Sequence, residues 1–190
     1  MSDAEADVVL HDFKNIFSLD GKVAVVTGGS RGLGLHAASG YFLPPKSLPN
    51  HTYPNPTAAN RSSRLLQAGC SKVFITSRKA SACAAAVAAL NALPNLAPGA
   101  RAYSIPADSS KVSEIERLVK EVEKETDHVD ILFANAGATW GEEFLKVDEK
   151  NGWDRVMDLN VKGVFFTVQK YVQISPLSLF CFLNLEYVWS

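Results

Sequence analysis

The chain has 190 residues, of which 47% are hydrophobic and 21% charged, an ordinary composition for a globular protein. Its length predicts a single domain over residues 1–190. A formal net charge of −1 excludes the basic field expected of a nucleic-acid-binding protein and a polybasic patch for a membrane surface. No apolar run reaches the roughly 20 residues of a membrane span.

The three cysteines, Cys70, Cys83 and Cys181, are scattered and lack the spacing of metal ligands. We therefore expect reduced thiols, no metal site and a cytoplasmic protein. Residues 1–7 are acidic and polar, which argues against a signal or transit peptide and favours the same location.

Residues 22–34 carry the most informative pattern. Val23–Val26 form an apolar run without alternation, which predicts a strand buried on both faces of a parallel sheet. Glycines follow at Gly28, Gly29, Gly32 and Gly34, ahead of a helix-like segment. Glycine permits a tight turn and a close approach of backbone N–H groups to a phosphate, and the helix N-terminus adds partial positive charge. The pattern predicts a cradle for dinucleotide phosphates, with an ordinary strand–turn–helix corner as the alternative.

Prolines interrupt the helix expected over residues 34–40. Residues 41–62 contain five prolines, and each costs about 3 kcal/mol or more inside a helix. Helical character returns at residues 64–68, with Gly69 as the C′ residue. We interpret 41–62 as an insertion within one helix and as a gene-model or splicing artefact; a long surface loop between two short helices is the alternative.

A second expected strand, Val73–Thr76, is followed by Ser77, Arg78 and Lys79. An NAD-specific site would place an acidic residue near this point to bind the ribose 2′-hydroxyl, and the sequence has none there. Cations suit a 2′-phosphate, because arginine makes paired charge-assisted hydrogen bonds. Together with Arg31 in the glycine loop, these residues favour NADP(H) over NAD(H). Simple solvation at a loop is the alternative for Arg78 and Lys79.

The middle of the chain alternates helical and strand patterns. We expect a helix over 80–93, a strand over 102–105, a helix with its apolar face at 115–122 and a strand over 129–134. Ser109 or Ser110 is the expected cap of the second of these helices.

Two motifs resemble those of the short-chain dehydrogenase/reductase family. Thr27-Gly28 followed by Gly32 and Gly34 resembles Thr-Gly-x-x-x-Gly-x-Gly, which differs from the Gly-x-Gly-x-x-Gly of other dinucleotide-binding enzymes. Residues 134–137, Ala-Asn-Ala-Gly, resemble the second signature Asn-Asn-Ala-Gly with Ala134 in place of the first asparagine. The Ala-Thr-Trp-Gly run at 138–141 narrows the resemblance to the branch of rhamnolipid-type 3-oxoacyl-[acyl-carrier-protein] reductases and their fungal relatives.

The resemblance implies an α/β fold: a Rossmann-like doubly wound parallel sheet with strand order 3-2-1-4, truncated after the long helix that follows strand 4. It implies contacts to the cofactor pyrophosphate from one loop, with Thr27, Gly28, Ser30, Arg31, Gly32, Leu33 and Gly34. Asp108 would contact the adenine, although a helix-cap or turn role is the alternative. Asn135, Ala136 and Gly137 would bracket the ribose, and the Asn135 side chain would tie neighbouring strands together. Trp140 would line the substrate mouth or pack as a structural aromatic.

Residues 153–165 resemble the family's long interface helix, and Asn160 matches the asparagine of its catalytic Asn-Ser-Tyr-Lys set. In the family that asparagine holds the helix open around a water of the proton relay; a helix residue bonding locally is the alternative. The set also needs a tyrosine to donate a proton and a lysine four residues later that lowers the tyrosine pKa. No tyrosine in the chain has a lysine at that spacing.

The resemblance ends near residue 172, and residues 173–190 form a tail unrelated to the family, with 177–183 as a surrogate fifth strand beside the fourth. The family implies an NADP(H)-dependent oxidoreductase that moves hydride to or from a carbonyl or hydroxyl carbon, as in a 3-oxoacyl thioester. It also implies a small-molecule substrate and a homo-oligomer through the long helix. The missing tyrosine–lysine pair favours an alternative, a cofactor-binding fragment without turnover.

Overall fold

The computed structural model describes residues 18–32, 35, 65–94, 96–174 and 180–183. Within them a five-stranded parallel sheet has the order β3-β2-β1-β4-β5. The strands are β1 (Val23–Thr27), β2 (Lys72–Thr76), β3 (Arg101–Ser104), β4 (Ile131–Ala134) and β5 (Phe180–Leu183). The predicted α/β sheet and its 3-2-1-4 order are confirmed, and the limits of β1 to β4 lie within two residues of those expected.

The fifth strand lies where the sequence suggested a surrogate strand. Phe180–Leu183 pairs in parallel with Ile131–Ala134, so it extends the sheet beyond β4. The expected start of this strand at residue 177 lies outside the described residues. So do the insertion 41–62 and, apart from residue 35, the helix expected over 34–40.

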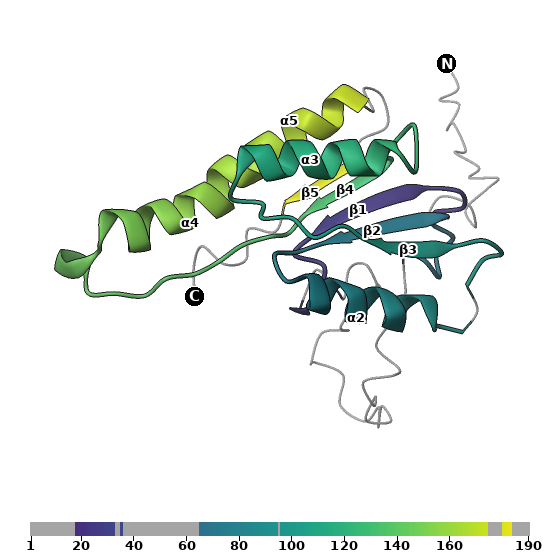
Figure 1. Cartoon of the computed structure of the whole chain (residues 1–190), viewed down its shortest axis with the longest axis horizontal. Helices are drawn as coiled ribbons and strands as arrows, with labels where there is room; N and C mark the ends of the chain where they lie inside the picture. Colours follow the sequence, from purple (N-terminus) through teal and green to yellow (C-terminus); the bar gives the residue numbers. More distant parts are fainter. Residues whose placement is uncertain (1–17, 33–34, 36–64, 95, 175–179, 184–190) are drawn as a thin grey trace, which may run out of the picture.

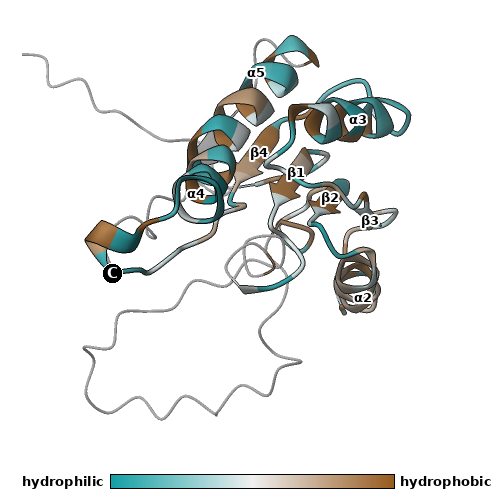
Figure 2. Ribbon diagram, turned by 60° about the vertical axis from the view of Figure 1, so that its left-hand side comes forward, coloured by the Kyte–Doolittle hydropathy of each residue, from teal (hydrophilic) through white to brown (hydrophobic). Residues whose placement is uncertain are grey.

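Alternate residues of the strands supply two apolar layers. Val23 and Val25 join Phe74 and Leu132 on one face, and Ala24 and Val26 join the opposite face. Figure 2 shows β1, β2 and β4 coloured hydrophobic between the helices. Because both faces are covered, a continuous apolar run such as β1 is buried along its whole length.

The helices divide between the two faces (Figure 1). On one face lie α3 (Val112–Glu123) and α5 (Val164–Ile174), which contribute Leu118, Val122 and Tyr171 to the first apolar layer. On the other lies α2 (Ala80–Asn91), with Leu90 in the second layer. The helix expected over 80–93 thus ends at Asn91, whose side-chain amide bonds to both backbone groups of Ala102 in β3.

The expected serine cap of α3 is wrong. Lys111 is the N-cap residue and makes no side-chain capping bond. Ser110 instead donates its N–H and its hydroxyl to Asp108 Oδ1, at 3.1 and 2.8 Å. Ser110 thus lies one residue before the N-cap position, and its hydroxyl serves the turn that precedes the helix.

Residues 65–69 form a turn that ends at Gly69, as expected for a C′ glycine. Gly69 has a φ of +112° and donates to the Leu66 carbonyl, while Cys70 donates to the Leu65 carbonyl. These two bonds make a Schellman motif. A side chain at Gly69 would also collide with Asp20, so the motif fits closely against the chain entering β1.

The long helix is present but is wider in places than a regular α-helix. The 3₁₀ turn η2 (Phe144–Lys146) precedes it, and it then runs through η3 (Glu149–Asp154), α4 (Arg155–Met157), η4 (Asp158–Gly163) and α5. Both η3 and η4 are π-helical, a form that often occurs at functional sites. No helix in the described part of the chain is long and apolar enough to cross a membrane.

Candidate functional site

A cavity of about 510 Å³ opens at the carboxyl ends of the strands. In a doubly wound parallel sheet this is the edge where ligands bind, beside the point where the strand order reverses. Its lining comes from four loops and from the long helix: Gly28, Ser30, Arg31 and Gly32; Ser77 and Arg78; Ala107, Asp108 and Ser109; Asn135 to Thr139; and Arg155 and Leu159.

The loop after β1 brings backbone to the cavity. Gly28 has a φ of +66°, and a Cβ there would lie 3.0 Å from both Asn135 Nδ2 and Ala136 Cα. Gly32 has a φ of +54° and faces open space. A side chain would strain the loop at either position, and at Gly32 it would fill space next to the backbone. Leu33 and Gly34 lie outside the described residues.

Thr27 joins the ends of β1 and β4 from beneath the cavity. Its hydroxyl oxygen accepts the N–H groups of Asn135 and Ala136, each at 3.0 Å. Asn135 Nδ2 donates back to the Thr27 carbonyl at 3.2 Å, so its side chain ties the two strands together, as expected. Thr27 is itself buried and supports the lining without forming part of it.

The loop after β2 contributes a hydroxyl and a guanidinium. Ser77 and Arg78 line the cavity, whereas Lys79 is the exposed N-cap residue of α2 and is not part of the lining. Buried Cys83 lies beneath, with its sulfur 3.1 Å from Ser77 Oγ. No carboxylate belongs to this loop, and Arg31 adds a second cation to the lining.

Asp108 follows β3, and it both holds a turn through its side chain and lines the cavity. Its Oδ1 holds the Ser110 bonds described above, and Lys111 Nζ lies 3.9 Å from Oδ2. The turn role that the sequence left open is therefore present. The neighbours Ala107 and Ser109 also line the cavity, although no motif singled them out.

Asn160 projects from the π-helical segment η4 to the loop after β4. Its Oδ1 accepts the Ala138 N–H at 2.9 Å, and its Nδ2 donates to the Ala138 carbonyl at 2.8 Å. The alternative of a local bond within the helix is wrong, because the partner lies 22 residues away in the chain. Asn160 thus fixes the wall of the cavity from behind.

The long helix also touches the loop after β3. A Cβ at Gly163 would lie 2.2 Å from the Ser109 carbonyl oxygen, so only glycine permits this approach. Asn160 and Gly163 therefore connect one helix to two different loops of the cavity.

Arg155 and Leu159 are the lining residues that sequence reasoning missed on the long helix. The Arg155 guanidinium lies 5.2 Å from the centre of the Trp140 ring, and Trp140 is 44% exposed outside the lining. Trp140 thus packs against the helix, the second of its two expected roles. The contact joins a loop to a helix of mixed π and α turns, so no simple periodicity indicates it.

Two buried groups lie outside the cavity and are chemically inert. Burial raises the pKa of the Tyr171 hydroxyl, and this side chain is fully enclosed in the first apolar layer. Burial, reinforced by nearby Asp130, raises the pKa of the Cys70 thiol to about 12. Neither is a proton donor to a ligand in the cavity. Among the described residues, no group of His, Cys, Asp and Glu is arranged to hold a metal ion.

A comparison with protein families agrees with this architecture. The family model of the short chain dehydrogenases matches residues 58–175. The chain belongs to this family. The expected resemblance is therefore confirmed.

Relatives with curated functions extend the match. It is 36% identical over 161 residues to the rhamnolipids biosynthesis 3-oxoacyl-[acyl-carrier-protein] reductase of Pseudomonas aeruginosa, covering 85% of this chain and 49% of that protein. It is 37% identical over 153 residues to the 2-dehydro-3-deoxy-D-gluconate 5-dehydrogenase of Escherichia coli, covering 80% and 47%. The chain thus spans about half the length of these relatives.

Solved structures give the same result. The RhlG/NADP active-site complex of Pseudomonas aeruginosa superposes with a TM-score of 0.64 at 34% identity, covering 83% of this chain and 49% of that one. A putative short-chain alcohol dehydrogenase from Sinorhizobium meliloti has a TM-score of 0.63 at 28% identity, covering 84% and 51%.

Proposed function

We propose that residues 1–190 form one NADP-binding domain of a short-chain dehydrogenase, an NADP(H)-dependent oxidoreductase acting on a carbonyl or hydroxyl substrate such as a 3-oxoacyl thioester. The observation that carries the proposal is the cavity lining at the strand ends, with glycine backbone, the hydroxyls of Ser30 and Ser77 and the cations Arg31 and Arg78. Such a lining suits a dinucleotide bearing several phosphates.

The glycine loop fits the pyrophosphate. Gly32 leaves open space where a side chain would project, so an anion can approach the backbone N–H groups there. Ser30 and Arg31 would add a hydroxyl and a positive charge from the same loop. Thr27 supports this proposed loop, and the loop continues through Leu33 and Gly34.

The loop after β2 fits a 2′-phosphate. Ser77 and Arg78 face the cavity, and the absence of a carboxylate in this loop removes the usual partner of a free 2′-hydroxyl. Lys79 would contribute at longer range, from outside the lining. Asp108 would meet the adenine through the oxygen that does not accept the Ser110 hydrogen bonds.

The strand order sets the direction of the cofactor. If the 2′-phosphate lies at β2 and the pyrophosphate at β1, the nicotinamide lies toward β4, where Asn135, Ala136 and Gly137 would bracket its ribose. A bound nicotinamide supplies or accepts the hydride at this end. Asn160 holds the Ala138 backbone beside it, and we propose that it serves the proton relay as well.

A second candidate is cofactor binding without turnover. It is favoured by the sequence, in which no tyrosine is followed by lysine at the fourth position, and by the enclosure of Tyr171 in the core.

We also propose a cytoplasmic location, consistent with the free thiols of Cys70 and Cys83. A homo-oligomer through the long helix is supported by exposed Val161 and Phe165.

NADPH fluorescence titration of the 190-residue chain tests the proposal. We expect NADPH to bind more tightly than NADH and Arg78→Ala to reduce this preference about 10-fold, as loss of a charge-assisted hydrogen bond predicts. Lys120→Ala, which removes an exposed charge from α3, is the matched control. Equal affinity for the two nucleotides would contradict the 2′-phosphate site. NADPH oxidation with ketones then separates the enzyme from the binding-only candidate.

A further inference from the structure

We propose that Arg155 forms an oxyanion-binding subsite at the β4 end of the cavity, so that the chain selects carbonyl substrates that carry a carboxylate or a phosphate. This inference rests on the proposed function for the position of the nicotinamide. It names a substrate class and a residue outside the cofactor-binding set.

Arg155 reaches the cavity from the long helix. It is the first residue of α4, and Leu159 one turn later lines the same space. Ala138 and Thr139 line the same cavity, and two hydrogen bonds with Asn160 hold the Ala138 backbone. The subsite thus combines a guanidinium, an apolar side chain and a fixed stretch of backbone.

This end of the cavity is the substrate end. Arg31 and Arg78 belong to the loops after β1 and β2, where the phosphates of the proposed cofactor lie. Arg155 belongs to the helix that follows β4, on the other side of β1 from β2. A carbonyl compound that meets the nicotinamide near Gly137 would therefore have Arg155 within the same cavity.

The charge of Arg155 is available to a ligand. Asp158, one turn further along the helix, pairs with Lys162 at 3.1 Å. Arg155 forms no ion pair with any residue that the structure describes. Its guanidinium lies over the Trp140 ring, and it donates no hydrogen bond to any of the described residues.

A planar guanidinium with free edge donors is suited to two oxygens of one anion. Carboxylate and phosphate share this geometry, and both accept paired charge-assisted hydrogen bonds from arginine. Leu159 beside it offers apolar contact to the carbon chain of the same molecule. A neutral ketone would leave the cation solvated and gain only the apolar contact.

The test measures binding of two matched ligand pairs to the 190-residue chain saturated with NADP⁺, by titration calorimetry. Acetoacetate is compared with methyl acetoacetate, and dihydroxyacetone phosphate with dihydroxyacetone. We expect the anion of at least one pair to bind about 10-fold more tightly than its neutral partner, as a charge-assisted hydrogen bond predicts. The pair with the larger preference distinguishes carboxylate from phosphate.

Arg155→Ala should reduce that preference to about 2-fold or less, and Arg155→Lys should retain part of it, because lysine keeps the charge but loses the planar fork. Lys150→Ala, an exposed cation on η3 outside the lining, should leave it unchanged. The NADPH affinity of Arg155→Ala should equal that of the unmodified chain.

Three outcomes would overturn the inference: equal binding of anionic and neutral ligands, a preference that survives Arg155→Ala, or an equal loss of NADPH affinity in that variant. The last would assign Arg155 to the cofactor. If the unmodified chain binds no NADPH, the proposed function fails, and the ligand pairs are then measured without nucleotide. Arg155-dependent anion binding under that condition supports the subsite, and its absence overturns it.

Discussion

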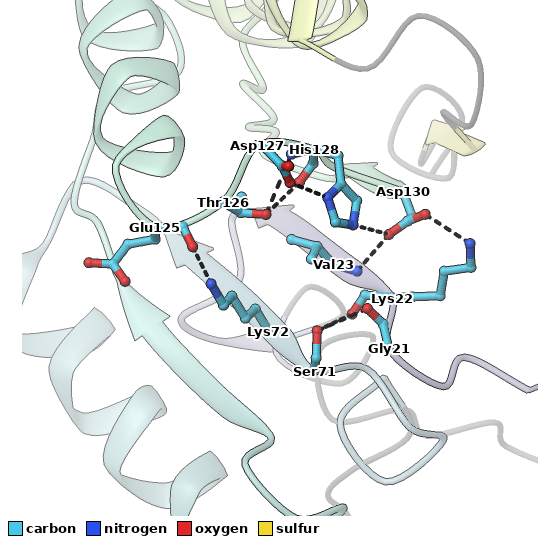
Figure 3. Close-up of polar contacts among 10 residues, drawn as sticks. All are labelled: Gly21, Lys22, Val23, Ser71, Lys72, Glu125, Thr126, Asp127, His128 and Asp130. Carbon is cyan, nitrogen blue, oxygen red and sulfur yellow. Dashed lines mark hydrogen bonds and ion pairs between the residues drawn. The ribbon is translucent and has the colours of Figure 1, made fainter.

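At the amino edge of the sheet a network of polar side chains closes the strand ends, whereas at the carboxyl edge polar side chains line a cavity. Asp130 occupies the centre of the amino edge (Figure 3). Its Oδ2 accepts the Val23 N–H at 2.8 Å, its Oδ1 accepts Lys22 Nζ at 2.9 Å, and His128 Nε2 lies 3.4 Å away. Ser71 donates to the carbonyls of Gly21 and Lys22, which closes the same edge.

Asp108 at the carboxyl edge pairs with Lys111, but the arginines there are unpaired within the described residues. Arg31, Arg78 and Arg155 all line the cavity, and none forms an ion pair within the part of the chain that the structure describes. Three cations around one cavity repel each other and gain little from the fold. Residues whose placement does not stabilise the folded state are concentrated at functional sites. The amino edge therefore stabilises the sheet, and the carboxyl edge is left for a ligand.

The largest effect should come from Asp130→Ala, which removes the acceptor of a buried backbone N–H and the partner of Lys22. We expect the free energy of unfolding to fall by about 3 kcal/mol, measured by urea denaturation. Asp127→Ala, whose side chain is 95% exposed, should leave the unfolding midpoint unchanged. Both variants should keep the NADPH affinity, because the amino edge lies at the opposite ends of the strands. A weakened affinity in folded Asp130→Ala would contradict this division.

Thr27→Val should act on the carboxyl edge. Valine cannot accept the N–H groups of Asn135 and Ala136, so we expect about 2 kcal/mol less stability and weaker NADPH binding together. Thr167→Val is the matched control, since both threonines are 2% exposed. The Thr167 hydroxyl donates only to the Gly163 carbonyl within its own helix, so its loss should cost about 0.5 kcal/mol or less. Equal losses in the two variants would show that Thr27 has no special role.

Acid should weaken the amino edge of the sheet. Burial alone would raise the pKa of Asp130, but the hydrogen bonds from Lys22 and the Val23 N–H outweigh it and hold the pKa below its ordinary value. Because the folded pKa lies below the unfolded one, the stabilisation is present above about pH 4 and is lost as the pH falls through the folded pKa. Urea titrations between pH 6 and pH 3 should show this loss. The Asp130→Asn variant should lack the part of the pH dependence of stability that comes from Asp130.

The smallest effects should come from two buried hydroxyls without a partner among the described residues, Thr76 Oγ1 and Tyr171 Oη. Thr76→Val and Tyr171→Phe remove these oxygens with little change in volume. We expect unchanged stability or a gain of up to about 1 kcal/mol, measured by thermal unfolding. A loss of ketone reduction in a fully stable Tyr171→Phe variant would contradict its place in the core.

The strands and the glycine loop were predictable because their signals are local. Val23–Val26 read as a doubly buried strand, and the order 3-2-1-4 followed from the family resemblance at Thr27–Gly34 and Asn135–Gly137. The wrong prediction, a serine cap of α3, arose where a side chain has more than one possible hydrogen-bond partner. Ser110 donates to Asp108 instead of capping α3, a choice between two local bonds that the sequence leaves open.

The rest of the cavity depends on contacts between distant segments. Ser109 lies beside the helix because Gly163 permits a close approach, and Arg155 reaches the cavity from a helix with π-helical turns. A regular period of 3.6 residues does not describe such a helix, so the sequence does not show which of its side chains face the cavity.

Amide hydrogen exchange with and without NADPH tests the central claim most directly. We predict that NADPH slows exchange in the loops of the carboxyl edge, from Gly28 to Gly32 and from Asn135 to Ala138, and leaves Val23, Ser71 and Asp130 unchanged. Protection at the amino edge, or equal protection of both edges, would contradict the assignment of the cavity as the nucleotide site.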